Sequence, residues 1–287
     1  MSIVSALDPR QGFRVEVLAI GDELLDGRVA DTNTLRLAIA LSDVGLKIAQ
    51  RTTVTDDIEA IVREAKAIVA RGAKLCVVSG GLGPTRDDVT SEAFAELLNV
   101  PMERDDAQVK RIEERLAKRG RPITDNQRKQ ADRPRGAETI FNPNGTAPGF
   151  ALRFDGCVFV STPGVPSEFD GMIAEAVIAP LREHAVAIEQ RSLHTYGLSE
   201  GEIDARLAPL AEQFPNVRVG FRAHMPEIHV SLSARAEHTQ ALEGAIEFAR
   251  CQLQDSVYTE SREAFASVVL DKLRKAGAKL ILAESCT

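Results

Sequence analysis

The chain has 287 residues, of which 44% are apolar and 27% charged, and its formal net charge at pH 7 is −7. This composition is typical of a globular protein with room for two domains, and no apolar run approaches the roughly 18 residues that span a bilayer. The acidic balance and the lack of a leader pattern in residues 1–12 predict a cytoplasmic protein without membrane or direct nucleic-acid contact.

Strand signals alternate with helical apolar stripes over the first 80 residues. The strand candidates are residues 13–20, 47–54 and 74–79. Residues 32–41 predict the first helix, and Asp56 with Glu59 forms a capping-box pattern at the start of the second. Strands separated by such helices predict parallel crossover units in a helix-covered sheet.

The third predicted strand runs into a glycine-rich turn. Its glycines can adopt backbone angles closed to other residues and leave their N–H groups open to a ligand, and the helix start that follows favours an anion. Adjacent Asp87 and Asp88 can hold a hard divalent cation that bridges to a phosphate. In the alternative interpretation the turn is purely steric, Asp88 caps the helix and Asp87 is a solvated charge.

The end of the first predicted strand carries two further carboxylates, Asp22 and Glu23. Ligands of parallel sheets bind at the carboxyl ends of the strands. We therefore expect these carboxylates to converge with residues 80–88, although the two segments are far apart in the sequence.

Two turns farther along the chain extend the candidate site. In the loop 141–150, Thr146 offers a hydroxyl beside Gly145, although a plain hairpin connection is the alternative. A strand over 158–161 then ends in a Pro-Gly turn, and Pro166 fits the first turn of the next helix.

A basic segment precedes these turns. Residues 110–135 hold ten basic side chains against four acidic ones. They form either a solvated helix face or an electropositive rim that steers an anionic nucleotide into the site.

The pattern changes near residue 184. Strand, helix, strand, strand and helix signals follow over residues 188–253, with a candidate closing strand at 257–258, and predict a small split βαβ domain. We see no concentrated chemistry there, and we expect His224 and His229 to be solvated or partner-facing. A helix stripe and a strand over 279–283 then begin a new unit.

These motifs, taken in order, resemble the CinA family (competence/damage-inducible protein A). Its first domain is similar to the molybdopterin-binding domain of the MoaB/Mog type. The matching segments are residues 21–25, 31–33, 80–85 with 87, 88 and 90, then 126, 130–131, 145–149, 163–166 with 168, and 197–200. The resemblance therefore covers nearly the whole chain.

The resemblance implies an α/β fold, with a three-layer, mostly parallel MoaB/Mog-like sheet domain followed by a small α+β domain. The expected boundaries are an N-terminal tail over 1–12, the first domain over 13–183, the middle domain over 184–260, and the start of a C-terminal domain over 261–287.

The same resemblance implies metal-dependent hydrolysis of ADP-ribose or a related nucleotide. The expected catalytic residues are Asp22, Glu23, Asp87 and Asp88, of which Asp22, Asp87 and Asp88 bind the metal. The expected phosphate and nucleotide contacts are Asn33, Gly80, Gly81, Leu82, Gly83, Pro84, Thr85, Gly145, Thr146, Pro163 and Gly164. The metal candidates are Mg²⁺, Mn²⁺ and Co²⁺, with K⁺ as a further candidate, and we expect a homodimer.

The closing residues 283–287 resemble the start of the family's nicotinamide mononucleotide deamidase domain, with Ser285 at the position of the nucleophile. A serine needs a positioned proton acceptor, so we expect Ser285 to be inert in this chain. Two other functions stay open: a molybdopterin-type binding module without hydrolysis, and an interaction protein in DNA uptake or damage response.

Overall fold

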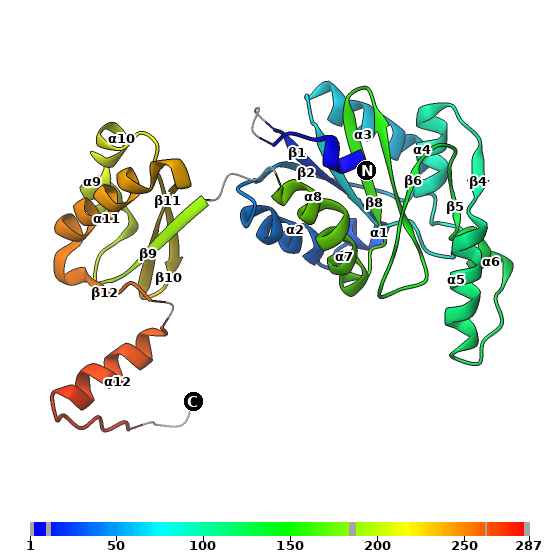
Figure 1. Cartoon of the computed structure of the whole chain (residues 1–287). Coiled ribbons are helices and arrows are strands. Elements are labelled where there is room, and N and C mark those ends of the chain that lie inside the picture. The colour runs from blue at the N-terminus through cyan, green and yellow to red at the C-terminus, as the bar shows by residue number, and fades with distance from the viewer. Residues whose placement is uncertain (1–2, 10–12, 184–187, 262, 284–287) are drawn as a thin grey trace. The chain divides into compact units, whose positions relative to one another are not determined.

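The computed structural model describes residues 3–9, 13–183, 188–261 and 263–283. The chain divides into two compact units, Met1–Val186 and Ala187–Thr287 (Figure 1). Ser285 lies outside the described residues, and the expected boundaries after residues 12 and 183 adjoin residues that also lie outside them. No helix in the described part of the chain is long and apolar enough to cross a membrane.

The first unit alternates strands and helices. Its strands are β1 (Val15–Ile20), β2 (Ile48–Val54), β3 (Leu75–Ser79), β4 (Met102–Arg104), β5 (Asp132–Pro134), β6 (Glu138–Ile140), β7 (Gly149–Phe154) and β8 (Cys157–Thr162). Its helices are η1 (Ile3–Ala6), α1 (Asp22–Leu25), α2 (Thr32–Ser42), α3 (Ile58–Ala70), α4 (Thr90–Leu98), α5 (Asp106–Ala117), α6 (Asp125–Lys129), α7 (Pro166–Ile173), η2 (Ala174–Ile178) and α8 (Ala179–Arg182).

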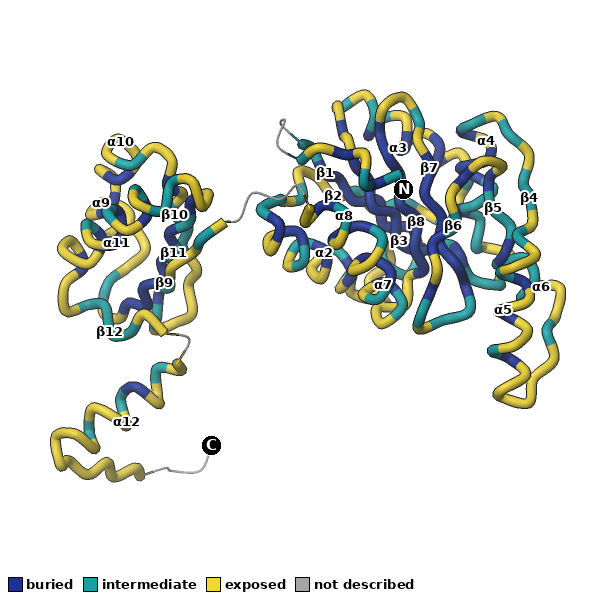
Figure 2. The backbone as a smooth tube through the Cα atoms, viewed as in Figure 1, coloured by how far each residue is buried: buried dark blue, intermediate teal, exposed yellow. Residues whose placement is uncertain are grey.

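Among the described residues, six strands form the main sheet in the order β2-β1-β3-β8-β7-β6. The first four run parallel, whereas β7 and β6 are antiparallel to their neighbours. Side chains of successive residues point to opposite faces, so each strand contributes to two cores. Val77 packs with α2 and α7 on one face, and Val78 packs with α3 and α4 on the other. The predicted three-layer α/β fold is confirmed (Figure 2).

The start of α3 corrects one prediction. The N-cap is Asp57, whose Oδ1 accepts the backbone N–H of Ala60 at 2.8 Å. Asp56, expected in that role, instead accepts the backbone N–H of Asp22 at 3.0 Å. Residues 56 and 57 are both aspartates and both precede the apolar positions of α3. The local sequence therefore does not show which of them is the N-cap.

The second unit is a small α+β domain. Its elements are β9 (Ile188–Tyr196), α9 (Glu200–Leu207), α10 (Leu210–Gln213), β10 (Arg218–His224), β11 (Glu227–Arg235), η3 (Ala236–His238), α11 (Thr239–Leu253), η4 (Gln254–Ser256), β12 (Val257–Thr259) and α12 (Phe265–Lys275). The sheet order is β10-β11-β9-β12, and each described neighbouring pair is antiparallel. Because β11 lies between β9 and β10, the predicted split βαβ arrangement is confirmed.

Two faces of this small sheet differ. Burial alternates along β11, and Ile228, Val230 and Leu232 pack with α9 and α11 in one core. The other face brings His194, Glu227 and His229 together. The sequence alone does not reveal this group, because strand pairing joins residues that are distant along the chain.

The predicted strand over residues 279–283 is also absent. These residues are exposed and have no strand conformation in the described part of the chain. An isolated strand leaves its backbone groups and its apolar side chains without partners, so an apolar run alone does not form one.

Candidate functional site

A cavity of about 510 Å³ lies at the carboxyl ends of β1, β3 and β8. Its lining combines a glycine loop, carboxylates, a proline-glycine turn and part of the loop between β6 and β7. The lining residues are Ile20, Glu23, Asp56, Gly80, Gly81, Leu82, Gly83, Pro84, Asp87, Asp88, Gln127, Gln130, Thr146, Ala147, Pro163, Gly164, Val165 and Glu168. This is the sheet edge at which parallel-sheet proteins bind ligands.

The glycine loop passes very close to neighbouring backbone. Gly80 has φ +112°, and a Cβ there would lie 2.1 Å from the carbonyl oxygen of Ile20. Gly81 has φ +68°, and a Cβ there would lie 2.1 Å from Oγ1 of Thr90, which donates to the carbonyl of Gly80 at 2.9 Å. Only glycine fits both the backbone angles and the space, so the first two glycines are required by the fold of the loop itself.

Asp88 holds the second half of this loop. Its Oδ2 accepts the backbone N–H of Thr85 at 2.8 Å and also accepts the Thr85 hydroxyl. Lys129 Nζ donates to the Asp88 carbonyl at 2.8 Å and pairs with Glu92 at 3.1 Å. Asp88 is thus a loop-closing residue, while Val89 stands at the N-cap of α4 without a side-chain capping bond.

Asp56 lies close enough to three other carboxylates for their charges to act on it. Burial is the largest cause that raises the pKa of Asp56, and the charges of Glu23, Asp22 and Asp87 raise it further. The nearby Thr85 side chain is the largest cause that lowers the pKa of Asp87. The site therefore holds an ionised Asp87 beside an Asp56 that takes up a proton more readily than an ordinary aspartate.

Asn33 lies behind the cavity and joins two of its turns. Its Nδ2 donates to Ser79 Oγ at 2.8 Å and to the Gly164 carbonyl at 2.9 Å, while its Oδ1 is buried without a hydrogen-bond partner among the described residues. These bonds fix the end of β3 against the turn that follows β8. Asn33 therefore supports both turns in this structure, and its predicted contact with a ligand stays a prediction.

The loop between β6 and β7 is organised by buried Asn142. Its Oδ1 accepts the backbone N–H of Gly145 at 2.7 Å, and its Nδ2 donates to the Ala147 carbonyl at 2.8 Å and to Glu168 Oε2 at 2.6 Å. A Cβ on Gly145 would lie 2.0 Å from the Glu168 carboxylate. Gly145 therefore lets that carboxylate approach the loop, and Thr146 is presented to the cavity.

A second cavity of about 340 Å³ lies between α5 and this loop, and it shares Thr146 with the first. Three cations line it, namely Arg111, Arg115 and Lys118. The Arg111 guanidinium lies 4.7 Å from the centre of the Phe141 ring, and Arg115 donates to the Pro143 carbonyl at 3.1 Å. Part of the basic segment therefore forms a cationic wall beside the first cavity.

The structure brings most of the predicted site residues together. The predicted residues that line the first cavity are Glu23, Gly80, Gly81, Leu82, Gly83, Pro84, Asp87, Asp88, Thr146, Pro163 and Gly164. Four other predicted residues do not line the first cavity, but each contacts or borders a residue of its lining. They are Asp22, Asn33, Thr85 and Gly145.

Sequence reasoning missed two carboxylates of the site, Asp56 and Glu168. Asp56 lies two residues after the end of β2, so the rule that ligands gather at strand ends could have identified it. Glu168 gave a weaker signal, because an acidic residue in the first turn of a helix is ordinary.

Two family models match consecutive parts of the chain. The model described as "Probable molybdopterin binding domain" matches residues 16–183, and that of "Damage-inducible protein CinA KH domain" matches residues 190–259.

Three known proteins illustrate these similarities. A "CinA-like protein" of Anaeromyxobacter sp. (strain Fw109-5) is 39% identical over 282 residues, which are 96% of this chain and 68% of that protein. The solved CinA of Thermoplasma acidophilum, described as having unknown function, is 32% identical with a TM-score of 0.51, covering 56% of this chain and 94% of that one. A MoaB from Thermus thermophilus, described as a molybdopterin biosynthesis enzyme, has a TM-score of 0.40 at 21% identity, covering 60% of this chain and 92% of that one.

The two family models follow each other along the chain, and the relative from Anaeromyxobacter matches 96% of it. The expected resemblance is confirmed, and the chain belongs to the CinA-like protein family, with a molybdopterin-binding-type domain followed by a KH domain.

Proposed function

We propose that the first domain hydrolyses the pyrophosphate bond of ADP-ribose or a related nucleotide and requires a divalent metal. The observation that carries this proposal is the pairing of two cavities that share Thr146. One has a glycine loop and carboxylates, and the other has three cations. A dinucleotide-like substrate has a pyrophosphate between two organic ends, which suits a site with a central floor and an adjoining cationic pocket.

The donor set fits a hard cation. Glu23, Asp56, Asp87 and Asp88 offer oxygen atoms, which Mg²⁺ and Mn²⁺ prefer to nitrogen or sulfur. Magnesium is commonly held by one or two carboxylates together with substrate phosphates, so a closed cage of protein ligands is not required. A bound divalent cation would lower the pKa of water and neutralise charge on the phosphoryl oxygens.

The residues divide into three roles in this reaction. Asp87, with Asp22 and Asp88 as further candidates, holds the metal, and the backbone N–H groups of the glycine loop bind phosphate oxygens. Asp56 or Glu23 accepts the proton of the attacking water. The water oxygen bonds to one phosphorus as the bridging P–O bond breaks, so ADP-ribose yields AMP and ribose 5-phosphate.

The cations of the second cavity bind the distal part of the substrate. Arg111 and Arg115 present guanidinium groups that can donate to sugar and phosphate oxygens, and Phe141 offers a ring face beside them. Loss of one of these cations should therefore raise KM more than it lowers kcat.

The test is hydrolysis of ADP-ribose by the purified chain with Mg²⁺, Mn²⁺ or Co²⁺, with and without K⁺, followed by chromatography of released AMP. We expect Asp87→Asn and Asp88→Asn each to lower kcat/KM by about 100-fold or more, since each removes a candidate ligand of the metal that neutralises the phosphoryl oxygens. Arg111→Met should raise KM by about tenfold. The matched controls are Asp26→Asn and Arg121→Met, which alter groups that line neither cavity.

Three results would contradict the proposal. They are turnover that survives excess chelator, turnover that is unchanged in both aspartate variants, and no hydrolysis of any nucleoside diphosphate derivative with any of the three metals. The unchanged Asp26→Asn control separates a specific loss from a general effect of removing negative charge.

The family match to a molybdopterin-binding domain favours a second candidate, a binding module that uses the same loop without hydrolysis. Equilibrium titration with molybdopterin distinguishes the two. Tight binding that is lost in Asp88→Asn, together with no turnover of pyrophosphates, would support the binding module.

A further inference from the structure

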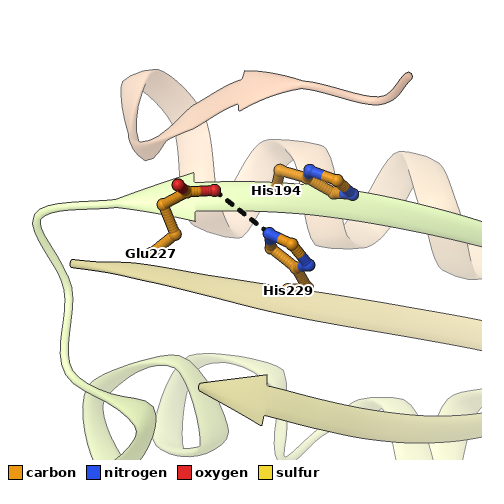
Figure 3. A group of neighbouring side chains, drawn as sticks. All are labelled: His194, Glu227 and His229. Carbon is orange, nitrogen blue, oxygen red and sulfur yellow. Dashed lines mark hydrogen bonds and ion pairs between the residues drawn. The ribbon is translucent and has the colours of Figure 1, made fainter. Parts of the chain in front are cut away.

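The open face of the small sheet in the second unit carries a cluster that the proposed hydrolysis does not use. His194 on β9 lies directly opposite His229 on β11, and Glu227 is two residues before His229 on the same face. Figure 3 shows the three side chains gathered across these two strands. One ligand atom from each lies within 4.8 Å of the other two.

The two histidine rings stack on each other. Their centroids are 3.8 Å apart with an angle of 14° between the planes, and the ring of His224 on β10 lies 4.8 Å from that of His229. Nε2 of His229 lies 3.1 Å from Oε2 of Glu227. His224 and His229 are five residues apart, a spacing that would not place two side chains on one face of a single strand. They meet because they lie on two strands, β10 and β11, that pair as a hairpin.

His194 is the least explained member of the cluster. The residue is only 8% exposed, and its buried Nδ1 has no hydrogen-bond partner among the described residues. A buried polar nitrogen without a partner costs free energy unless a ligand satisfies it. The His194 ring stacks on a second imidazole, and one of its nitrogens lies within 4.8 Å of a ligand atom of His229 and of Glu227. A metal ion is the kind of group that such an incompletely bonded imidazole can bind.

The surroundings supply a supporting residue for the carboxylate. The Tyr258 hydroxyl on β12 donates to Oε2 of Glu227, and Phe265 at the start of α12 packs edge-on against the Tyr258 ring at 5.0 Å. Such contacts orient a metal-binding carboxylate and commonly affect affinity 10- to 100-fold.

We propose that His194, His229 and Glu227 bind a borderline divalent transition metal of the Zn²⁺ class. Two imidazoles and one carboxylate form a known zinc donor set, whose fourth position takes water. Zinc ligands lie about 2.0–2.2 Å from the ion. The three side chains must therefore rotate toward one another when the ion binds. The hydrogen bond between His229 and Glu227 is then replaced by a bond from each of them to the metal. Mg²⁺ prefers oxygen donors and should not bind here.

The test is a Zn²⁺ titration of the full chain against a coloured chelator, with Mg²⁺ as the comparison metal. Asp87→Asn/Asp88→Asn serves as the background, so that carboxylates of the first domain do not contribute. We expect one Zn²⁺ per chain and at least a tenfold weaker affinity in His194→Gln and in His229→Gln. The matched control, His238→Gln, lies outside the cluster and should bind as the background does.

A histidine variant could lose zinc affinity because it misfolds, and two measurements distinguish that case from the loss of a ligand. Circular dichroism of the metal-free variants checks their fold, and X-ray absorption of the unaltered cluster with Co²⁺ or Zn²⁺ reports nitrogen ligands directly. Tyr258→Phe should weaken binding by about tenfold while the three ligands remain. No Zn²⁺ bound by the background protein, equal affinity in both histidine variants and the background, or an all-oxygen ligand shell would overturn the proposal.

Discussion

At the residue scale, the buried carboxylate of Glu16 connects the main sheet of the first unit to a helix that covers it. Glu16 is fully buried on β1, a strand whose other residues are all apolar. Arg71 Nη2 donates to its Oε2 at 2.7 Å, and Arg14 Nε donates to its Oε1 at 2.6 Å. Arg71 also pairs with Glu64 at 2.7 Å, so the network links β1 to α3 and the turn that follows it.

We predict that Glu16→Gln lowers the free energy of unfolding by about 3 kcal/mol. Breaking a buried pair costs about 3–5 kcal/mol, and the partial exposure of Arg71 and Arg14 favours the lower end. Urea denaturation at pH 7 measures the change. Asp26→Asn, which removes an exposed carboxylate paired with Arg28, is the control and should leave the free energy of unfolding nearly unchanged.

The pH dependence has a definite sign. Burial alone raises the pKa of Glu16, but hydrogen bonds from Arg71 and Arg14 outweigh it, and the net pKa lies below the ordinary value of 4.5. The stabilisation is therefore complete above about pH 4.5 and is lost as the pH falls through the folded-state pKa. The difference in stability between wild type and Glu16→Gln should shrink at low pH, and a difference that grows there would contradict this account.

At the element scale, α2 has two contrasting faces. Leu37 and Leu41 are buried against the sheet, whereas Leu35 and Ile39, four residues apart, are 62% and 59% exposed. The expected homodimer needs a surface of this kind, since apolar side chains on one helix face form a patch that association can bury.

We predict that Ile39→Glu raises the dimer dissociation constant at least tenfold, a change of about 1.4 kcal/mol, because it places a charge in an apolar interface. Analytical ultracentrifugation measures the constant. Ala70→Glu, which adds the same charge to an exposed position on α3, is the control. A wild type that stays monomeric at about 100 µM, or equal constants in the two variants, would contradict the prediction.

Elements with strong periodicity were predictable, and those that depend on distant partners were not. The helical stripe of α3 and the Ser199–Glu202 capping box of α9 are local signals, and both are present. The short strand β6 is only three residues long and pairs with β7, so its conformation depends on a partner rather than on its own pattern.

At the scale of the whole molecule, the two units have separate hydrophobic cores. The core of the second unit, which includes Leu193, Val230 and Ile246, shares no buried residue with the core clusters of the first in the described parts of the chain. Each unit is also within the size range of an independent domain.

We predict that residues 1–186 and 187–287 fold separately, each with a cooperative thermal transition in circular dichroism. If the proposed function is correct, only the first fragment hydrolyses ADP-ribose, at a rate within about threefold of the full chain, since the two cavities lie within it. A first fragment without a cooperative transition would contradict the separation of cores, whereas a folded but inactive one would count against the proposed site.

The sequence by itself determined the periodic helices, the parallel strands and the glycine loop, because these depend on local spacing and backbone sterics. It also predicted that Glu23 would meet residues 80–88, since parallel strands end at one edge. Only the tertiary structure decided that Asp88 closes the loop, that Asp56 faces the cavity, and that His194 stacks on His229. Those contacts depend on which side chains meet after strands and turns pair, and no local pattern contains that information.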